Sequence, residues 1–222
     1  MIYLLRHGKP EACTDKRYLG QADIPISPSG LAAAKEWLPR FNEAGISFAK
    51  VYSSDLSRCI ETAKAASGLP AEDILQTAYL REINLGDWDC MLKDEVKDRF
   101  AAQWEKFGSD ISFRPPNGES FADVTERVFP ILNCIRQTPG NKLVVSHAGV
   151  IRSLLRVLMD LSISEMFALK LDYAGLTLLA EGETEEKQGT VESGRHSFFV
   201  LGVNLNPEDP WPPAAMACQS RS

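Results

Sequence analysis

Histidine is scarce in this chain, with three copies among 222 residues, and paired cysteines are missing. The five cysteines are odd in number and scattered, and no two of them form a Cys-x-x-Cys pair. A disulfide framework or a zinc site needs paired ligands, so we expect reduced thiols in a cytoplasmic protein. No apolar run reaches membrane-spanning length, and the apolar start before Arg6 is too short for a signal peptide.

An excess of positive charge is also missing. The 30 acidic residues outnumber the 24 basic ones and give a formal net charge of −6. Nucleic acids and anionic membranes need a cationic face on their partner, so we expect this protein to bind neither. A few buried arginines can still form a local anion site inside an acidic protein. For the assembly, we expect a monomer or a homodimer.

The length of 222 residues suits one domain with a full hydrophobic core. Strand-like apolar runs alternate with helical segments, and this alternation predicts an α/β fold. We expect a three-layer α/β/α sandwich with a mostly parallel sheet and antiparallel edge strands. The single domain is placed at residues 1–205, and residues 206–222 are expected to form a disordered tail because they have little to pack. The acidic segment 182–194 is expected to be a solvated hairpin loop.

Apolar patterning and helix-end signals place the individual elements. Strands are expected at residues 2–5, 49–52, 74–79, 142–146, 167–171, 176–180 and 197–203. Helices are expected at residues 28–42, 55–67, 92–107, 120–136 and 150–161. Asp55 is expected to cap the second helix, and Ser120 with Asp123 has capping-box spacing. Pro39 and Pro130 are expected to bend or divide the helices that contain them.

Histidine, arginine and glutamate residues occur where the expected strands end. His7 follows the first strand with Arg6 just before it, and His147 follows the fourth strand. Arg58 lies in the helix after the second strand, and Glu82 follows the third strand. The carboxyl ends of the strands form the ligand crevice of an open α/β sheet. We therefore expect these five side chains to meet at one rim.

This set of side chains is suited to phosphoryl transfer. Guanidinium groups bind phosphate oxygens in a bidentate manner and stay charged. One neutral imidazole can attack phosphorus and hold the phosphoryl group, while a second stabilises charge on the phosphate oxygens. Glu82 can protonate the leaving oxygen and then act as a base when water attacks. Backbone N–H groups at Ala148 and Gly149, which open a helix, add an anion site.

Five ordered segments resemble the motifs of the histidine phosphatase superfamily, also called the phosphoglycerate mutase-like superfamily, whose signature is Arg-His-Gly. The segments are Arg6-His7-Gly8, Tyr52–Arg58, Leu80-Arg81-Glu82 with Gly86-Asp87-Trp88, Asn117–Ser120 and Val145–Arg152. The tripeptide alone would be a weak signal because tripeptides recur by chance. Five blocks in the family's order, spread over residues 1–155, form a specific pattern.

The resemblance implies a role for each member of the set. His7 would accept the phosphoryl group, and Glu82 would be the proton donor. Phosphate would be bound by Arg6, Arg58 and His147. The implied activity is hydrolysis of a small phosphorylated metabolite through a phosphohistidine. Neither a metal nor another cofactor is implied.

The loop at residues 9–27 bears on substrate choice within the family. Gln21 occupies a loop position near the phosphate, and the segment Gly20–Pro25 is similar to α-ribazole-phosphatase-like members. The helix start at Ala148 would also contact the substrate. Cys13 stands where relatives commonly have Asn, and Lys9 stands where many have Glu. These departures concern substrate binding and leave the core chemistry unchanged.

Two other functions fit the same architecture. In a phosphoglycerate mutase the phosphohistidine returns its phosphoryl group to the substrate. Such mutases carry a longer basic insertion between the Glu and second His blocks, whereas the segment 83–146 here is moderate and its lysines are balanced by acids. That favours hydrolysis. A catalytically silent binding module is the third option, and the intact set of five side chains speaks against it.

Overall fold

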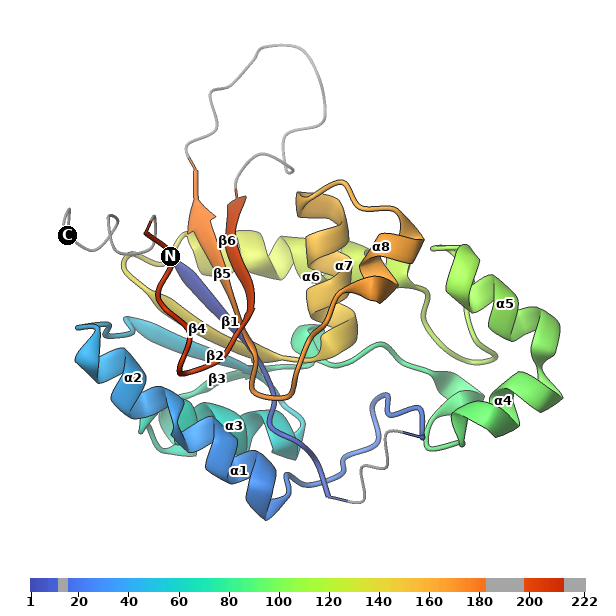
Figure 1. Cartoon of the computed structure of the whole chain (residues 1–222), viewed down its shortest axis with the longest axis horizontal. Coiled ribbons are helices and arrows are strands. Elements are labelled where there is room, and N and C mark those ends of the chain that lie inside the picture. Colours follow the sequence, from blue (N-terminus) through green and yellow to red (C-terminus); the bar gives the residue numbers. More distant parts are fainter. Residues whose placement is uncertain (12–15, 183–197, 214–222) are drawn as a thin grey trace, which may run out of the picture.

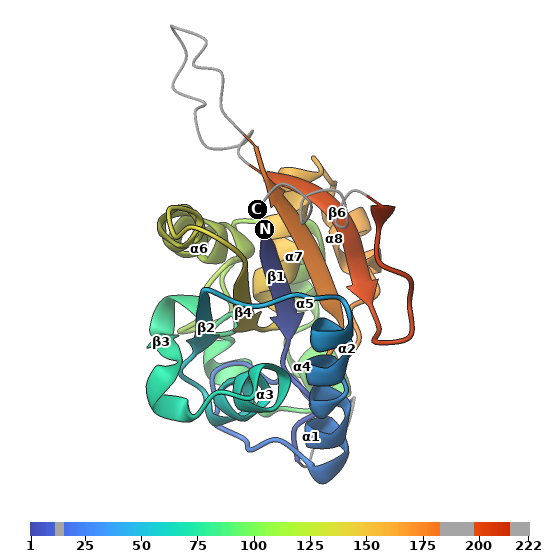
Figure 2. The same cartoon turned by 90° about the vertical axis from the view of Figure 1, so that its left-hand side faces the viewer.

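In the computed structural model, a six-stranded sheet runs through the molecule with helices on both of its faces (Figures 1 and 2). The structure describes residues 1–11, 16–182 and 198–213. The strands are β1 (Ile2–Arg6), β2 (Lys50–Ser54), β3 (Leu75–Thr77), β4 (Lys142–Ser146), β5 (Leu176–Glu181) and β6 (Phe198–Leu205). Their order across the sheet is β3-β2-β4-β1-β5-β6.

The sheet is mostly parallel. Strands β1 to β4 run in one direction, while β5 and β6 pair antiparallel at one edge. This confirms the α/β fold with antiparallel edge strands. Because β1, β2 and β4 are parallel neighbours, their carboxyl ends at Arg6, Ser54 and Ser146 meet at one rim.

Helices form a layer on each face of the sheet. One layer contains α1 (Pro28–Lys35), α2 (Trp37–Glu43) and α3 (Ser57–Ser67). The other contains α4 (Lys93–Arg99), α5 (Ala101–Ser109), α6 (Phe121–Arg136), α7 (Ala148–Leu158) and α8 (Ile163–Ala168). Within the described ranges, no helix has both the length and the apolar character needed to cross a membrane.

Strand β1 contributes to the core on both faces of the sheet. Ile2 and Leu4 belong to the cluster beneath α6 and α7, whereas Tyr3 and Leu5 belong to the cluster beneath the α1–α3 layer. All four side chains are at most 1% exposed. Successive side chains of a strand point to opposite faces, so an uninterrupted apolar run is what a strand covered on both faces requires.

Two of the sequence-based expectations are wrong, one about a helix cap and one about a strand. Asp55 does not cap α3, which begins at Ser57; its carboxylate instead binds the Arg81 guanidinium at 2.6 and 2.7 Å. The segment 167–171 is not a strand, because α8 ends only at Ala168. A capping box at the start of α8 explains the helix, as reciprocal side-chain bonds there satisfy backbone N–H groups that begin it.

The expectations for Pro39 and for the capping box at Ser120 are met, whereas Pro130 lies inside an undivided α6 and the bend expected there stays a prediction. The helix expected at residues 28–42 is divided at Glu36 into α1 and α2. Pro39 has no N–H to donate to the carbonyl of Lys35, four residues earlier, so a continuous helix would lose that bond. Ser120 and Asp123 form the expected capping box of α6. The helix expected at residues 92–107 is divided into α4 and α5.

The segment after Asn206 packs more than expected. The Trp211 ring lies 6.1 Å from that of Phe41 and 6.2 Å from that of Tyr3, between ring centroids. Arg40 donates a hydrogen bond of 2.9 Å to the carbonyl of Asp209. Residues 206–213 therefore cover the core beneath α2, because a large indole has apolar surface to bury there. Residues 183–197, on which most of the expected hairpin loop falls, residues 214–222 and Cys13 lie outside the described residues. The domain boundary stays a prediction.

Replacing Trp211 with alanine should destabilise the fold. The substitution removes an indole that contacts three core aromatic rings, so we expect the free energy of unfolding to fall by about 2 kcal/mol. Urea unfolding followed by circular dichroism measures this change. Phe199→Ala is the matched control, since that ring is 60% exposed and its loss should cost less than about 0.5 kcal/mol. Equal stability of the two variants would contradict the packing role.

Candidate active site

His7 is held in one tautomer just beyond β1. Its side chain is buried, and Nδ1 lies 2.7 Å from the carbonyl oxygen of Gly8. A carbonyl only accepts hydrogen bonds, so Nδ1 carries the hydrogen and Nε2 carries the lone pair of the neutral ring. The Gly8 N–H in turn donates to Thr62 Oγ1 at 2.9 Å, which ties this turn to α3.

The surroundings of His7 keep its ring neutral. Burial holds the pKa of His7 well below its usual range, and the positive charges of Arg58 and Arg6 lower it further. The hydrogen bond to Gly8 opposes this shift without reversing it. A neutral imidazole with its lone pair on Nε2 is a nucleophile, so this residue has the required protonation state at neutral pH.

His147 faces His7 across the rim. It is the residue before α7, and the two imidazole centroids lie 4.9 Å apart. Its Nδ1 lies 3.4 Å from Nη2 of Arg58, and its Nε2 lies 3.0 Å from Oγ of Ser54. Guanidinium only donates, so Nδ1 accepts and the Nε2–H donates to Ser54. Burial lowers the pKa of His147 well below its usual range, and the neighbouring His7, Arg58 and Arg6 add to this shift.

Arg58 is a buried cation whose hydrogen bonds reach only neutral groups. It is 2% exposed and donates to the backbone carbonyls of Ala22 and Gly20, each at 2.8 Å. Among the described residues it forms no ion pair with a carboxylate. Carbonyl dipoles satisfy its N–H groups without cancelling its charge, so the site keeps a net positive potential for an anion.

Arg6 is positioned by a tyrosine that the sequence did not reveal. Its guanidinium carbon lies 3.8 Å from the centre of the Tyr173 ring, a cation–π contact, and Nη1 donates to the carbonyl of Leu171. The Tyr173 ring is also 5.6 Å from that of His7. Tyr173 lies in the segment between α8 and β5, and none of the sequence motifs includes it. Only the fold brings it to the rim.

Glu82 completes the rim after β3. The residue is 8% exposed, and Oε1 of its carboxylate accepts hydrogen bonds from the backbone N–H of Ile83 at 2.8 Å and of Gly149 at 2.9 Å. The Gly149 amide belongs to the first turn of α7. A Cβ added at Gly149 would lie 2.2 Å from Oε1, so only glycine allows this contact.

A further arginine, Arg127, supports the backbone around Glu82. Arg127 of α6 donates to the backbone carbonyls of Tyr79, Arg81 and Glu82, at distances from 2.6 to 3.1 Å. It also pairs with Glu119, whose Oε2 accepts from the N–H of Asn84. The carbonyl contacts fix the path of the backbone on either side of Glu82. Arg127 lies in the middle of a helix, where charged residues are common, so the sequence did not indicate that it supports the backbone.

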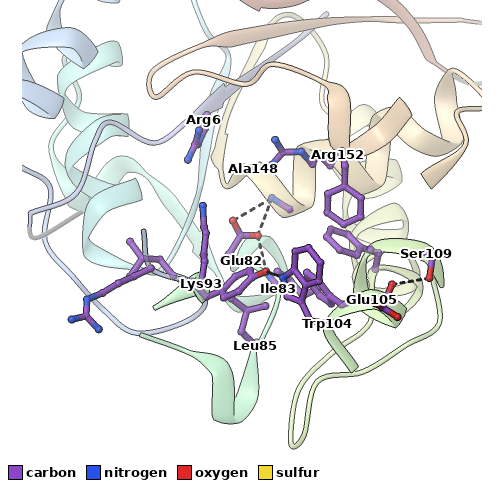
Figure 3. Close-up of a pocket in the computed structure, with 18 of the residues that line it drawn as sticks. Arg6, Glu82, Ile83, Leu85, Lys93, Trp104, Glu105, Ser109, Ala148 and Arg152 are labelled. Atoms are coloured by element: carbon purple, nitrogen blue, oxygen red, sulfur yellow. Dashed lines mark hydrogen bonds between the residues drawn. The ribbon is translucent and has the colours of Figure 1, made fainter. Parts of the chain in front are cut away.

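The two remaining expected residues lie near Glu82. Gln21 donates from Nε2 to the Glu82 carbonyl at 3.0 Å, so its side chain joins the loop before α1 to the Glu82 segment. Contact of Gln21 with phosphate stays a prediction. Ala148, the first residue of α7, lines a cavity of about 930 Å³ together with Arg6 and Glu82. Figure 3 shows Arg6, Glu82 and Ala148 around one end of this cavity.

No group of three or more His, Cys, Asp or Glu side chains within the described ranges is arranged to hold a metal ion. Cys59 Sγ lies 3.3 Å from His147 Nε2, and both side chains are buried. A cysteine and a histidine this close could suggest a pair of metal ligands. Burial raises the pKa of Cys59 well above its usual range, so this sulfur stays protonated and is not a thiolate ligand. The expectation that the chemistry needs no metal stays a prediction.

The two neutral histidines should make the fold sensitive to mild acid. Their folded pKa values lie below that of the unfolded chain, so below about pH 6.5 the unfolded state gains protons that the folded state does not. We expect the free energy of unfolding to fall by up to about 1.4 kcal/mol per pH unit for each histidine. Urea titrations from pH 7.5 to 5.5 measure this slope. In His147→Gln the free energy of unfolding should change less steeply with pH. If the free energy of unfolding of the wild type did not change with pH, the two histidines could not both be neutral in the folded protein.

Proteins of known sequence match most of this chain. A bifunctional protein of Mycobacterium tuberculosis is 33% identical over 182 residues, which are 80% of this chain and 49% of that protein. The human 6-phosphofructo-2-kinase/fructose-2,6-bisphosphatase 4 is 32% identical over 170 residues, covering 76% of this chain and 35% of the relative. The chain thus spans about half or less of the length of these curated relatives.

Solved structures share the fold along nearly their whole length. A mycobacterial glucosyl-3-phosphoglycerate phosphatase is 26% identical with a TM-score of 0.69, over 81% of this chain and 92% of that one. YhfR of Bacillus stearothermophilus is 26% identical with a TM-score of 0.76, over 90% and 94%. A putative α-ribazole-5′-P phosphatase of Escherichia coli, 24% identical with a TM-score of 0.74 over 92% and 95%, shares the fold.

The match to a family covers the rim and strands β1 to β5 of the sheet. The sequence model of the histidine phosphatase superfamily (branch 1) matches residues 2–193. This range includes the Arg6-His7-Gly8 signature and every other motif that the resemblance used. The rim geometry, the sheet topology and this match agree, and the chain belongs to the histidine phosphatase superfamily.

Proposed function

We propose that this protein is a phosphatase that hydrolyses a small phosphorylated metabolite through a phosphohistidine on His7. The observation that carries the proposal is the orientation of His7, whose Nδ1–H donates to Gly8 and leaves the lone pair on Nε2. Arg6, Arg58 and His147 surround this ring as groups that bind phosphate oxygens. A nucleophile and its anion site are thus assembled before the substrate arrives.

In the first step, His7 Nε2 forms a bond to phosphorus while the ester P–O bond breaks. The leaving oxygen takes a proton from Glu82, which lies on the α7 side of the rim. In the second step, water attacks the phosphohistidine, its proton passes to the Glu82 carboxylate, and the N–P bond breaks. Glu82 is then protonated for another cycle, and inorganic phosphate is the second product.

His147 has a different task from His7 although both rings are neutral in the free protein. A phosphate dianion between the two rings would raise the pKa of His147, because it adds negative charge beside a group whose neighbours are cationic. A proton on Nδ1 would let that nitrogen donate to a phosphate oxygen. The Nε2–H bond to Ser54 keeps the ring in place during this change.

The comparisons support phosphate-ester chemistry and leave the substrate open. The names of the similar proteins include a glucosyl-3-phosphoglycerate phosphatase and a fructose-2,6-bisphosphatase. We extend to this chain only the shared chemistry, hydrolysis of a phosphate monoester. We also propose that it works without metal or other cofactor, in the cytoplasm, as a monomer or homodimer that binds neither nucleic acid nor membrane.

Hydrolysis of 4-nitrophenyl phosphate tests the proposal directly. We expect turnover by the wild type that persists in EDTA, and a loss of at least about 1,000-fold in His7→Ala because the covalent route is removed. Trapping of an acid-labile phosphoryl group on the wild type identifies the intermediate. Equal activity of the two proteins would refute the role of His7. In phosphorus NMR with 3-phosphoglycerate, isomerisation without phosphate release would favour a mutase.

Gly149→Ala tests the role of Glu82 without changing that side chain. The added Cβ would meet Oε1 at 2.2 Å, so the carboxylate must leave its position. We expect kcat for an alkyl phosphate to fall about 100-fold or more, because a poor leaving group needs the proton donor. With 4-nitrophenyl phosphate, whose leaving group needs little protonation, phosphohistidine should accumulate in a rapid-quench experiment, since the base for water attack is displaced.

A double-mutant cycle supplies the control for this prediction. Glu82→Gln should show the same leaving-group dependence, and Gly149→Ala with Glu82→Gln should lose no more than either change alone. If the losses in activation free energy do not add in this way, both substitutions disrupt the same interaction. If the two losses add fully, Gly149 acts through another interaction.

A further inference from the structure

The cavity beside the rim is much larger than a phosphate group needs. Its volume is about 930 Å³, and it extends from Arg6 and Glu82 toward α4 and α5. The phosphoryl group would lie at the Arg6 end, so the space beyond Glu82 is available to the alcohol part of a substrate. The lining of this space therefore carries information about the leaving group.

One side of the cavity is aromatic. Ring contacts connect Tyr18, Phe107, Phe121 and Phe167, with centroid distances of 5.3 to 6.1 Å. Trp104 of α5 joins them and donates from its indole nitrogen to the Tyr18 hydroxyl at 2.9 Å. This bond fixes the indole, and all five side chains line the cavity. Such a wall stacks against flat or apolar groups.

The other side is cationic. Arg17, Lys93 and Arg152 line the cavity in addition to Arg6, whereas the acidic residues that line it, among those the structure describes, are Glu82 and Glu105. Within the described part of the chain, none of these three additional cations forms an ion pair. Burial lowers the pKa of Arg152, and the nearby charge of Glu82 counteracts that shift. In a protein of net charge −6, unpaired cations at one cavity mark a site for an anion.

The two kinds of lining are separated along the cavity. Figure 3 shows the nitrogen ends of Arg6, Lys93 and Arg152 on the side of the Glu82 carboxylate. Trp104, Glu105 and Ser109 lie farther along, away from Arg6. An anion bound by Lys93 or Arg152 would thus be close to the ester oxygen that Glu82 protonates, and an apolar group would lie beyond it.

We propose that the preferred substrate is a phosphate monoester with a second anionic group near the ester and a flat or apolar body beyond it. The proposal rests on the phosphatase function proposed above and specifies its substrate class. Lys93 and Arg152 bind the second anion, which can be a carboxylate or another phosphate. Trp104 and the aromatic wall bind the body. A substrate with only one of these two features fills only one side of the cavity.

Four phosphate esters separate the two features. Phenyl phosphate has a ring without a second anion, and 3-phosphoglycerate has a carboxylate without a ring. Glycerol 3-phosphate has neither, and 3-carboxyphenyl phosphate has both. We expect kcat/KM of wild type for 3-carboxyphenyl phosphate to exceed those for phenyl phosphate and 3-phosphoglycerate by about tenfold each, which corresponds to one charged hydrogen bond or one stacked ring. Values within threefold of one another would overturn the proposal.

Single variants assign the preference to its side chains. Lys93→Met should lower the ratio of kcat/KM for 3-carboxyphenyl over phenyl phosphate about tenfold. Lys106→Met is the matched control, because it removes a lysine of the same pair of helices that does not line the cavity, and it should keep the wild-type ratio. Trp104→Leu should lower the ratio of 3-carboxyphenyl phosphate over 3-phosphoglycerate. An equal effect of Lys93→Met and Lys106→Met would contradict the assignment.

Binding to His7→Ala separates this proposal from the proposed function. Calorimetric dissociation constants for the four esters report the cavity without turnover. If the wild type hydrolyses all four esters alike and His7→Ala binds them alike, the phosphatase function stands and the substrate class is wrong. If no ester is hydrolysed while 3-carboxyphenyl phosphate binds at least about tenfold more tightly than the others, the function is wrong and the cavity preference stands.

Discussion

The geometry of the rim depends on one hydrogen bond, from His7 Nδ1 to the carbonyl of Gly8. It determines which nitrogen of the ring carries the lone pair, and burial beside two arginines keeps that nitrogen unprotonated. A histidine without this bond could present either nitrogen, and one exposed to water would be partly charged near neutral pH. The strand that ends at Arg6 and the turn that follows it place the ring where this bond can form.

The positive charge of the rim is preserved by the choice of its partners. Arg58 donates to carbonyls of the loop before α1, and Arg6 lies against an aromatic ring. Arg81 and Arg127, which lie behind the rim, are paired with carboxylates. Neutral partners satisfy a guanidinium without neutralising it, whereas a carboxylate removes most of its field. The two arginines of the rim and the two behind it are thus distinguished by what they bind.

The sequence predicted the sheet and the five rim residues because both follow from local patterns. Apolar runs define the strands, and the parallel order of β1, β2 and β4 brings residues at their carboxyl ends together. Asp55 was misassigned because a capping residue and an ion-pair partner look the same in sequence. Tyr173, Arg127 and Trp211 were missed for another reason, since each acts through contacts with residues more than 40 positions away that no local pattern encodes.

His147 immediately precedes helix α7, and the first turn of that helix presents the Gly149 amide to Glu82. The His147 imidazole and the Glu82 carboxylate are therefore linked through the first turn of α7. The cavity walls at α4 and α5 belong to a separate stretch of chain that does not share this turn. Mutations there can accumulate without disturbing the reaction centre, so a protein of this design can acquire a new substrate during evolution while its reaction is unchanged.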